Sequence, residues 1–429
     1  MAAKKTVTSA TKPAKKTAAA PSFQKSKELF LRAAEVIPGA IYGHQSPAIT
    51  VPGSFPYYAA HGEGAYFWDV DGNKYVDYLC AYGPMVSGYG NRVVDDAAVA
   101  EYRKGNCLNL PSPLMVNLAE RLTGLIPWAD WAVFAKNGTD VTTWCTLVAR
   151  EHTGRKKIVA AKGEYHGAAP WCTPGHGGIV EEDRANMLYF TWNKLETLKA
   201  LFDTHKGEIA GVIMTPFHHP SFADSELPAP GFWQGVRKLC DENGAVLILD
   251  DVRCGFRLDM HGSQAYFGFE PDLACYCKAI ANGYPLSAGA GRNSMKAAAA
   301  NVFLTGSYWT STASMAAALA NLDHLEKIDG VKTMNELGDL LMKGLVERGK
   351  AFGYDQVATG PGALPFVRFG CENNFMRQQV FCAEMIQRGQ FLHPHHNWFL
   401  SAAHTKADIQ ATLDAAEEVF PLVKKHFGD

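Results

Sequence analysis

Three charged residues of the sequence stand where a parallel β-sheet would place them for catalysis. The apolar run 245–249 is followed by Asp250 and Asp251, and the apolar run 273–277 is followed by Lys278. Ligands of open parallel sheets bind at the carboxyl ends of strands, so both positions are candidates for an active site. A lysine removed from water has a lowered pKa and can attack a carbonyl group. Simpler explanations are a surface lysine whose stem covers apolar neighbours, and two aspartates of which one faces solvent and one caps a turn.

The segment Asn137-Gly138-Thr139-Asp140 adds a possible anion site between a predicted strand and a predicted helix. Small and hydroxyl residues at such a turn present backbone N–H groups and a helix N-terminus to a phosphate. Thr139 could equally be an ordinary helix N-cap, so the segment alone is a weak signal. A phosphate site, a strand-end carboxylate and a strand-end lysine are together the groups that pyridoxal 5′-phosphate (PLP) needs.

Alternating strand and helix patterns between about residues 130 and 290 would position these groups. They predict strands over 131–135, 157–161, 209–214, 245–250 and 273–277, and helices over 139–151, 194–204 and 231–242. Fully apolar strands separated by helices indicate a mostly parallel sheet with both faces covered, an α/β fold.

Both ends of the chain predict a second, smaller α+β unit. The expected elements are a helix over 26–36, a hairpin over 65–78 that turns at Asp71-Gly72, helices over 313–327, 330–352, 374–388 and 406–426, and a strand over 365–369. We therefore expect small-domain segments over 22–75 and 329–429 and a large domain over 76–328. Residues 1–21 contain five lysines and no acidic residue, which predicts a disordered tail.

Composition excludes several classes of protein. Among 429 residues, 41 Lys and Arg balance 43 Asp and Glu, a net charge of −2, which argues against nucleic-acid or membrane-surface binding. No run approaches the ~20 apolar residues of a membrane span. The ten cysteines are scattered, which favours reduced thiols in a cytoplasmic protein over a disulfide framework.

Several stretches of the sequence carry a family resemblance. They are Leu249–Arg257 (LDDVRCGFR), His261–Gly268 (HGSQAYFG), Pro271–Leu273, Lys278–Pro285 (KAIANGYP), Gly64–Asn73 and Gly163–Gly167 (GEYHG). These motifs resemble those of class-III aminotransferases, in the branch of glutamate-1-semialdehyde aminomutase and the β-amino-acid aminotransferases. The similarity covers nearly the whole chain after about residue 26, and it implies a fold-type I PLP enzyme.

The resemblance implies roles for the cofactor-binding residues. Lys278 would form the Schiff base with PLP, and Asp250 would keep the pyridine nitrogen protonated. Val252 and Tyr165 would cover the two faces of the ring, and Ser307 would reach the phosphate of a neighbouring subunit. The other implied contacts are Asn137, Gly138 and Thr139 at the phosphate, His166, and His218 in place of the family's glutamine beside the 3-oxygen.

The sequence departs from the family where substrates are held. Related enzymes carry a carboxylate-binding arginine after the motif at 37–39 or in a late strand, but neither 40–47 nor the strand expected over 397–401 contains one. Since histidine cannot reproduce the bidentate guanidinium fork, we expect a substrate with its amine or carbonyl on a neutral polar or aromatic body. A second substrate could use another arginine, with Arg368 the first candidate. The predicted pocket residues are Tyr42, His44, Tyr82, Trp171, His393, His395, His396 and Trp398, although the aromatic ones could instead pack in the core.

Together these features predict a PLP-dependent aminotransferase that moves an amino group from a donor amine to a carbonyl acceptor, working as a homodimer or larger homo-oligomer. One alternative is a PLP-dependent isomerase of the same fold, either an aminomutase or a racemase. Another is a non-catalytic protein that has kept the fold. No metal site is expected, because the histidines have no Cys or carboxylate at ligand spacing.

Overall fold

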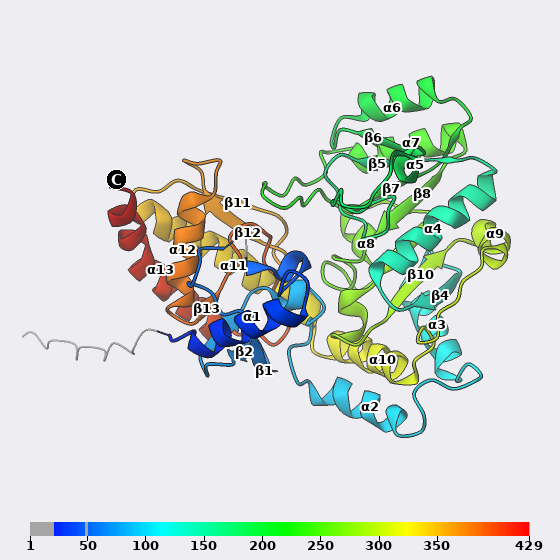
Figure 1. Ribbon diagram of the computed structural model, residues 1–429. Helices are drawn as coiled ribbons and strands as arrows, with labels where there is room; N and C mark the ends of the chain where they lie inside the picture. The colour runs from blue at the N-terminus through cyan, green and yellow to red at the C-terminus, as the bar shows by residue number, and fades with distance from the viewer. Residues whose placement is uncertain (1–20, 48–49, 429) are drawn as a thin grey trace, which may run out of the picture.

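A seven-stranded sheet forms the lobe at the right of Figure 1, in a computed structural model that describes residues 21–47 and 50–428. The strand order is β4-β10-β9-β8-β7-β5-β6. Their bounds are β4 Trp131–Ala135, β5 Lys157–Ala161, β6 Met187–Phe190, β7 Ile209–Met214, β8 Val246–Asp250, β9 Leu273–Tyr276 and β10 Ser287–Gly291. Every neighbouring pair is parallel except the two that involve β10. The predicted α/β fold with a mostly parallel sheet is confirmed. The tail predicted over 1–21 lies outside the described residues except for Pro21.

The two faces of this sheet pack against different helices. Along β8, Leu247 and Leu249 join one apolar cluster while Val246 and Ile248 join the other, as the period of two in a strand requires. One face is covered by α4 (Gly138–Thr153) and α9 (Lys296–Asn301). The other face is covered by α3 (Leu114–Leu125), α6 (Leu195–Thr204), α7 (Phe232–Asn243) and α10 (Thr312–Lys327). The remaining helices of this lobe are α2 (Arg92–Tyr102), α5 (Glu181–Arg184) and α8 (Ser263–Phe267).

Strand β10 was not predicted, because its residues are Ser, Ala and Gly only. Their small size is a packing requirement. A Cβ atom on Gly289 would lie 3.0 Å from Cζ3 of Trp144 on α4, and one on Gly291 would lie 2.2 Å from Cζ2 of Trp131. The strand therefore lacks the bulky apolar residues by which buried strands are recognised.

Both ends of the chain build the second lobe, at the left of Figure 1. Its sheets run β1-β2-β3-β13 and β11-β12. The bounds are β1 Ala59–Glu63, β2 Tyr66–Asp69, β3 Lys74–Asp77, β11 Gln356–Thr359, β12 Phe366–Phe369, β13 Gln390–Phe391, α1 Gln24–Val36, α11 Gly330–Ala351, α12 Met376–Ile386 and α13 Lys406–Phe427. The hairpin β2–β3 and the long helices agree with the sequence pattern. The domain boundaries after residues 75 and 328 stay a prediction.

The strand expected over 397–401 is a correction. This segment is extended but forms isolated backbone bonds, from Trp398 N to Pro365 O (2.8 Å) and from Phe399 N to Tyr78 O (2.8 Å). Because its successive N–H groups bond to different segments, no ladder forms. No helix in the described part of the chain is long and apolar enough to cross a membrane.

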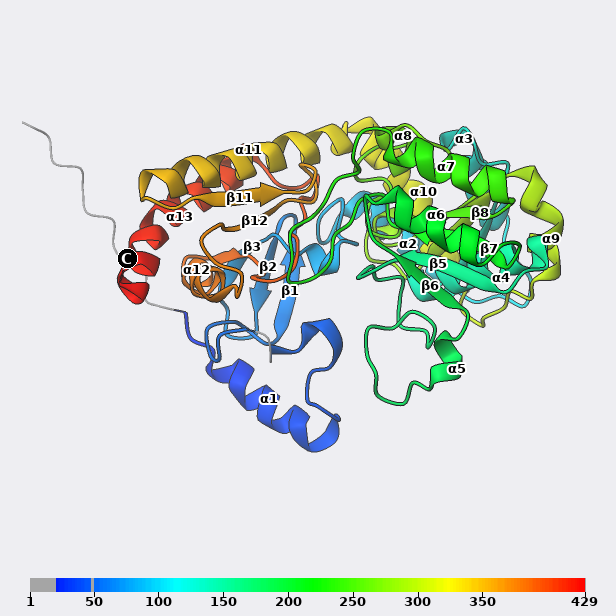
Figure 2. The same cartoon turned by 90° about the horizontal axis from the view of Figure 1, so that it is seen from above.

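A loop that follows β7 connects the two lobes, and Figure 2 shows it reaching from the seven-stranded sheet toward the second lobe. Asp224 accepts two hydrogen bonds from Arg368, each 2.7 Å long. Ser225 N donates to Thr359 Oγ1 at 3.1 Å. The loop is thereby fixed at the edge where the strands of the large sheet end.

Candidate active site

The two aspartates after β8 point to different partners. Asp250 is buried, its Oδ2 lies 2.7 Å from Nδ1 of His166, and its Oδ1 accepts the N–H of Val252 at 3.2 Å. Asp251 is fully buried and accepts the N–H of Ser263 at 2.9 Å, which fixes the start of α8. Burial raises the pKa of Asp251 to about 7. Neither carboxylate faces solvent, so the explanation that one of the two aspartates is a surface residue is wrong. The other part of that explanation, an aspartate that caps a turn, agrees with the contacts of Asp251.

His166 lies between two carboxylates. Burial by itself lowers the pKa of His166, but hydrogen bonding to Asp250 and Glu164 and their charges raise it to about 9. Glu164 Oε2 lies 3.4 Å from the imidazole Nε2, and Glu164 Oε1 accepts the N–H of Thr215 at 3.0 Å. His166 is therefore positively charged at neutral pH and forms an ion pair with the carboxyl group of Asp250. Glu164 was not predicted as a site residue, although it stands two positions before His166 in the GEYHG motif.

Lys278 stands directly after β9 in an unusual backbone conformation. Its φ of +45° lies in the left-handed region, which residues with a side chain seldom adopt and which is found at functional sites. Burial, followed by the charge of Arg253, lowers the pKa of Lys278 to about 8. Its amine makes no hydrogen bond or ion pair with any other residue that the structure describes. A partly neutral, unpaired amine at a strand end is chemically suited to act as a nucleophile.

Two buried asparagines hold the backbone that follows Lys278. Asn321 donates to the carbonyl of Ala279 at 2.7 Å and to that of Ile280 at 3.1 Å. Asn282, also left-handed with φ of +45°, accepts the N–H of Ser87 at 2.8 Å. Sequence reasoning missed both, because their partners come from distant segments.

The start of α4 offers free backbone donors. Asn137 Oδ1 accepts the N–H of Asp140 at 3.0 Å, so the Asn137 side chain is the helix N-cap. The N–H groups of Gly138 and Thr139 donate to no other described residue. A Cβ atom on Gly138 would lie 3.0 Å from Cγ1 of Val252, so only glycine leaves this space open.

These groups fit PLP. The unpaired amine of Lys278 matches its aldehyde, the free N–H groups at the start of α4 match its phosphate, and the carboxylate of Asp250 matches its ring nitrogen.

The other predicted cofactor contacts differ in their surroundings. Tyr165 is 47% exposed. Burial is the main cause of its raised pKa, and the charges of Arg253 and Asp250 also affect that pKa, so both residues lie within electrostatic range of it. The imidazole of His218 lies with its Nε2 3.0 Å from the carbonyl oxygen of Lys162. His219 is therefore a second candidate for the contact with the 3-oxygen of PLP. His219 is buried and accepts a hydrogen bond from Arg253 through its carbonyl at 3.3 Å. Ser307 is exposed.

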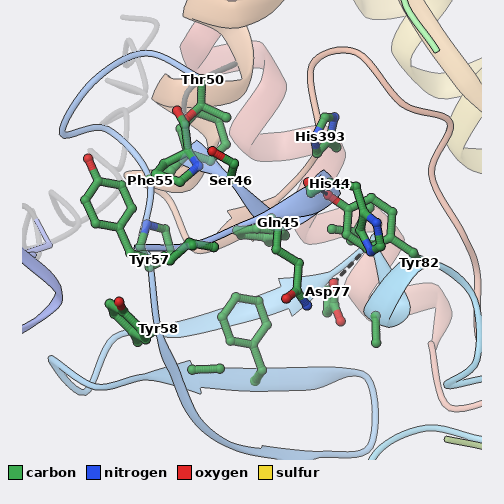
Figure 3. A pocket seen from close by; sticks show the side chains of 18 of the residues that line it. His44, Gln45, Ser46, Thr50, Phe55, Tyr57, Tyr58, Asp77, Tyr82 and His393 are labelled. Atoms are coloured by element: carbon green, nitrogen blue, oxygen red, sulfur yellow. Dashed lines mark hydrogen bonds between the residues drawn. The ribbon is translucent and has the colours of Figure 1, made fainter. Parts of the chain in front are cut away.

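A cavity of about 570 Å³ opens beside this site. Figure 3 shows His44 and Tyr82 at one end, Tyr57 and Tyr58 at the other, and Gln45 between them. The hydroxyl of Tyr82 donates to the carbonyl of His44 at 2.6 Å. Burial, then the charge of Lys278, lowers the pKa of His44, so the lysine lies within electrostatic range of this end of the cavity.

The predicted pocket residues are only partly brought together. Tyr42, His44, Tyr82 and His393 line the cavity. His396 is neutral, since burial holds its pKa well below the usual value, and its ring lies 5.2 Å from that of Tyr82.

Three predicted pocket residues do not line this cavity, and their role in substrate binding stays a prediction. Trp398 is fully buried and donates to the carbonyl of His393 at 2.8 Å, so it belongs to the core. His395 stacks on Phe222 with ring centres 4.5 Å apart. Trp171 donates to Thr143 Oγ1 at 3.0 Å, behind His166.

Other candidate ligands are also occupied or scattered. Arg368 donates two hydrogen bonds to Asp224 and two more to the carbonyls of Phe369 and Glu372, so it is not free to bind a substrate. In the described part of the chain no three His, Cys, Asp or Glu side chains are placed to hold a metal ion.

Known proteins resemble this chain over nearly its whole length. A family model described as aminotransferase class-III matches residues 50–413. The aminopentol aminotransferase of Sphingopyxis macrogoltabida is 42% identical over 404 residues, 94% of this chain and 96% of that protein. The glutamate-1-semialdehyde 2,1-aminomutase of Desulforamulus reducens is 32% identical over 95% of this chain and 100% of that protein. A solved structure of the FumI protein of Sphingopyxis sp. MTA144, in its PLP internal aldimine form, matches with a TM-score of 0.92 and 42% identity, covering 95% of this chain and 98% of that one.

Proposed function

This chain belongs to the class-III aminotransferases and is a PLP-dependent aminotransferase; from that premise we propose that its amine substrate carries the amino group on a neutral, hydroxylated carbon chain. The supporting observation is the cavity beside Lys278, whose described lining contains no lysine or arginine to attract a carboxylate. The lining is instead rich in hydroxyl, amide and imidazole groups, namely Tyr42, His44, Gln45, Ser46, Thr50, Tyr57, Tyr58, His61, Tyr82 and Tyr89.

Among these groups, Tyr58 provides the most specific argument for a hydroxylated substrate. Its hydroxyl oxygen is buried and has no hydrogen-bond partner among the described residues. A buried hydroxyl without a partner costs about 1–3 kcal/mol, and a hydroxyl of the substrate would relieve that cost once a small movement of the Tyr58 ring turns its oxygen into the cavity. The lining carboxyl of Asp77 is already occupied, since it accepts the hydroxyl of Tyr89 at 2.6 Å. The name of the aminopentol aminotransferase describes a substrate of the same chemistry, a hydroxylated amine.

We assign the catalytic roles as the family motifs imply. When bound, PLP carries the amino group from donor to acceptor while its ring draws electrons from the reacting carbon. Lys278 holds the cofactor and, as a neutral amine, moves the proton at the substrate carbon. Asp250 holds the proton of the ring nitrogen, with His166 behind it. The N–H groups of Gly138 and Thr139 bind the phosphate.

The proposal includes a homodimer. Leu110 and Phe303 are 77% and 86% exposed on two neighbouring loops, an unusual exposure for large apolar side chains. Asn106 joins these loops, because its Oδ1 accepts the hydroxyl of Ser311 at 2.6 Å. Ser307 lies on the second loop, so a second copy covering this face would meet it. The ten free cysteines suit a reducing compartment, and we place the enzyme in the cytoplasm.

Substrate comparison tests the amine assignment. We would measure kcat/KM for an aminopolyol, the matching alkylamine without hydroxyls, and an α-amino acid of similar length. We expect the aminopolyol to be preferred, and we expect Tyr58→Phe to lower its kcat/KM about fivefold while leaving the alkylamine unchanged, in keeping with the loss of one neutral hydrogen bond. Preference for the amino acid by orders of magnitude would refute the assignment.

A further inference from the structure

We infer that Arg253 binds the carboxylate of the second substrate, an α-keto acid that accepts the amino group. The inference rests on the proposed function, because it completes the recognition of the acceptor at the same site. Arg253 directly follows Val252 in the motif after β8. Nothing in the sequence distinguishes it from the other arginines, whereas its surroundings in the structure do.

Arg253 has hydrogen-bonding capacity to spare. Its Nη1 donates to Asn397 Oδ1 at 2.8 Å and to the carbonyl of His219 at 3.3 Å. Its Nε and Nη2 donate to no described residue, and no described carboxylate forms an ion pair with it. By contrast, Arg257 donates to the carbonyls of Gly83 and Leu400, and Arg368 is paired with Asp224. Arg253 is therefore a guanidinium fork with a side still available for an anion.

The charge of Arg253 acts on the reacting end of the site. It contributes to the lowered pKa of Lys278, directly after β9, and to that of His44, which lines the cavity. Its other charged neighbour is Asp250, whose oxygens already accept from His166 and Val252.

The two histidines near Arg253 carry no charge that could balance the guanidinium. His219 and His396 have pKa values held well below the usual value, first by burial and then by Arg253, so both are neutral. Arg253 is half-buried, and an incoming anion would compensate its partly desolvated positive charge, which forms no ion pair with a described residue.

The chemistry of the fork selects a carboxylate next to the reacting carbon. A guanidinium matches a planar carboxylate with two parallel, charge-assisted hydrogen bonds. In an α-keto acid the carboxylate is bonded directly to the carbonyl carbon, so its anchor must lie close to Lys278. The hydroxylated amine and the acceptor thus use different contacts, the cavity for one and Arg253 for the other.

Single-turnover kinetics on the acceptor half-reaction test this inference. Holoenzyme loaded with pyridoxamine phosphate is mixed with pyruvate or with pyruvamide, its neutral counterpart, and the cofactor absorbance is followed. We expect wild type to prefer pyruvate by about 10²-fold, as two charge-assisted hydrogen bonds allow. Arg253→Met should abolish this preference by slowing pyruvate alone, and Arg253→Lys, which keeps the charge but loses the fork, should fall between. Arg368→Met is the matched control and should retain the preference.

A binding measurement separates recognition from chemistry. Propionate and propionamide are titrated into PLP-loaded enzyme, and we expect Arg253→Met to weaken propionate binding at least tenfold without affecting propionamide. A retained preference for pyruvate in Arg253→Met, or an equal loss for pyruvate and pyruvamide, would overturn the inference. The amine half-reaction is measured separately on PLP-loaded wild type, so failure there with an aminopolyol refutes the proposed function and leaves the test of Arg253 intact.

Discussion

The imidazole of His166 lies with its Nδ1 2.7 Å from Oδ2 of Asp250, so a buried histidinium stands behind the carboxylate that faces the cofactor site. Glu164 stands on the other side of the same imidazole. This row of three side chains fixes the charge and orientation of Asp250 before any substrate arrives. Preorganised charge of this kind costs no reorganisation during the reaction.

Asp250→Asn should lower kcat by orders of magnitude, about 10²–10⁴-fold, because an amide cannot hold the proton of the ring nitrogen. His166→Gln should have a smaller effect, about tenfold, because the carboxylate remains while its support is lost. Steady-state kinetics, with circular dichroism to verify folding, would measure both. Unchanged turnover in a folded Asp250→Asn enzyme would contradict the assigned role.

The charge of His166 should make stability depend on pH. Its pKa rises from 6.5 to about 9 on folding, so its stabilising contribution is complete below pH 6.5 and is lost as the pH rises through 9. We expect the difference in Tm between wild type and His166→Gln to be largest at low pH and to shrink across this interval. Thermal denaturation at a series of pH values measures it. A difference that is constant with pH would show that folding does not raise the pKa of His166.

Lys278 should react with PLP at a lower pH than an ordinary lysine. With a pKa lowered from 10.5 to about 8, its amine loses its proton as the pH rises through 8, and the rate of PLP capture by the apoenzyme should rise with it. Arg253→Met should shift this rise to higher pH, because a neighbouring positive charge is removed. Stopped-flow absorbance measures the rate, and Lys278→Ala should show no such capture and almost no turnover. A rise centred near 10 would contradict the burial of the amine.

Gly138→Ala should weaken PLP binding by about tenfold without unfolding the enzyme. The new methyl group would lie 3.0 Å from Cγ1 of Val252, so the start of α4, whose N–H groups are assigned to the phosphate, would have to shift. Adding Val252→Ala should restore part of the affinity, since it removes the crowded atom. Fluorescence titration of the apoenzymes with PLP compares the variants. Equal affinity in all of them would place the cofactor elsewhere.

Phe303→Ser should raise the dimer dissociation constant at least tenfold, because about 1.5–3 kcal/mol of apolar burial is lost for each such side chain. Ser307→Ala should leave the dimer intact but accelerate loss of PLP. Leu422→Ser, on α13 of the other lobe, is the control for surface polarity. Sedimentation velocity and PLP retention after dilution measure these effects. A fully active monomer would refute the shared site.

The sequence was most informative where one strand or helix carries its own pattern. The bounds of β4, β5, β7, β8 and β9 were predicted to within one residue, because each is a short, mostly apolar run. Lys278 and Asp250 stood out because charges at such strand ends are rare. The antiparallel β10 was invisible, since its small residues are explained only by the tryptophans that pack over them.

The site residues that the sequence did not reveal depend on contacts between distant segments of the chain. Arg253 and Arg368 look alike in the sequence, and only the fold pairs Arg368 with Asp224 while leaving Arg253 without a carboxylate. The roles of Asn282 and Asn321 likewise depend on partners far along the chain. The orientation of Trp398 could not be predicted, because its segment is extended without belonging to a sheet.

The small residues of β10 make the site sensitive to substitutions in this strand, because α4 packs directly against them. Trp144 on α4 packs over Gly289, and the first N–H groups of the same helix are the ones assigned to the phosphate. A methyl group at position 289 would push the helix outward and move its anion-binding end, although it touches no ligand. Directed evolution of this enzyme for tighter or looser cofactor retention therefore has a target on the far face of the sheet, and random substitutions there will be selected against as strictly as those beside Lys278.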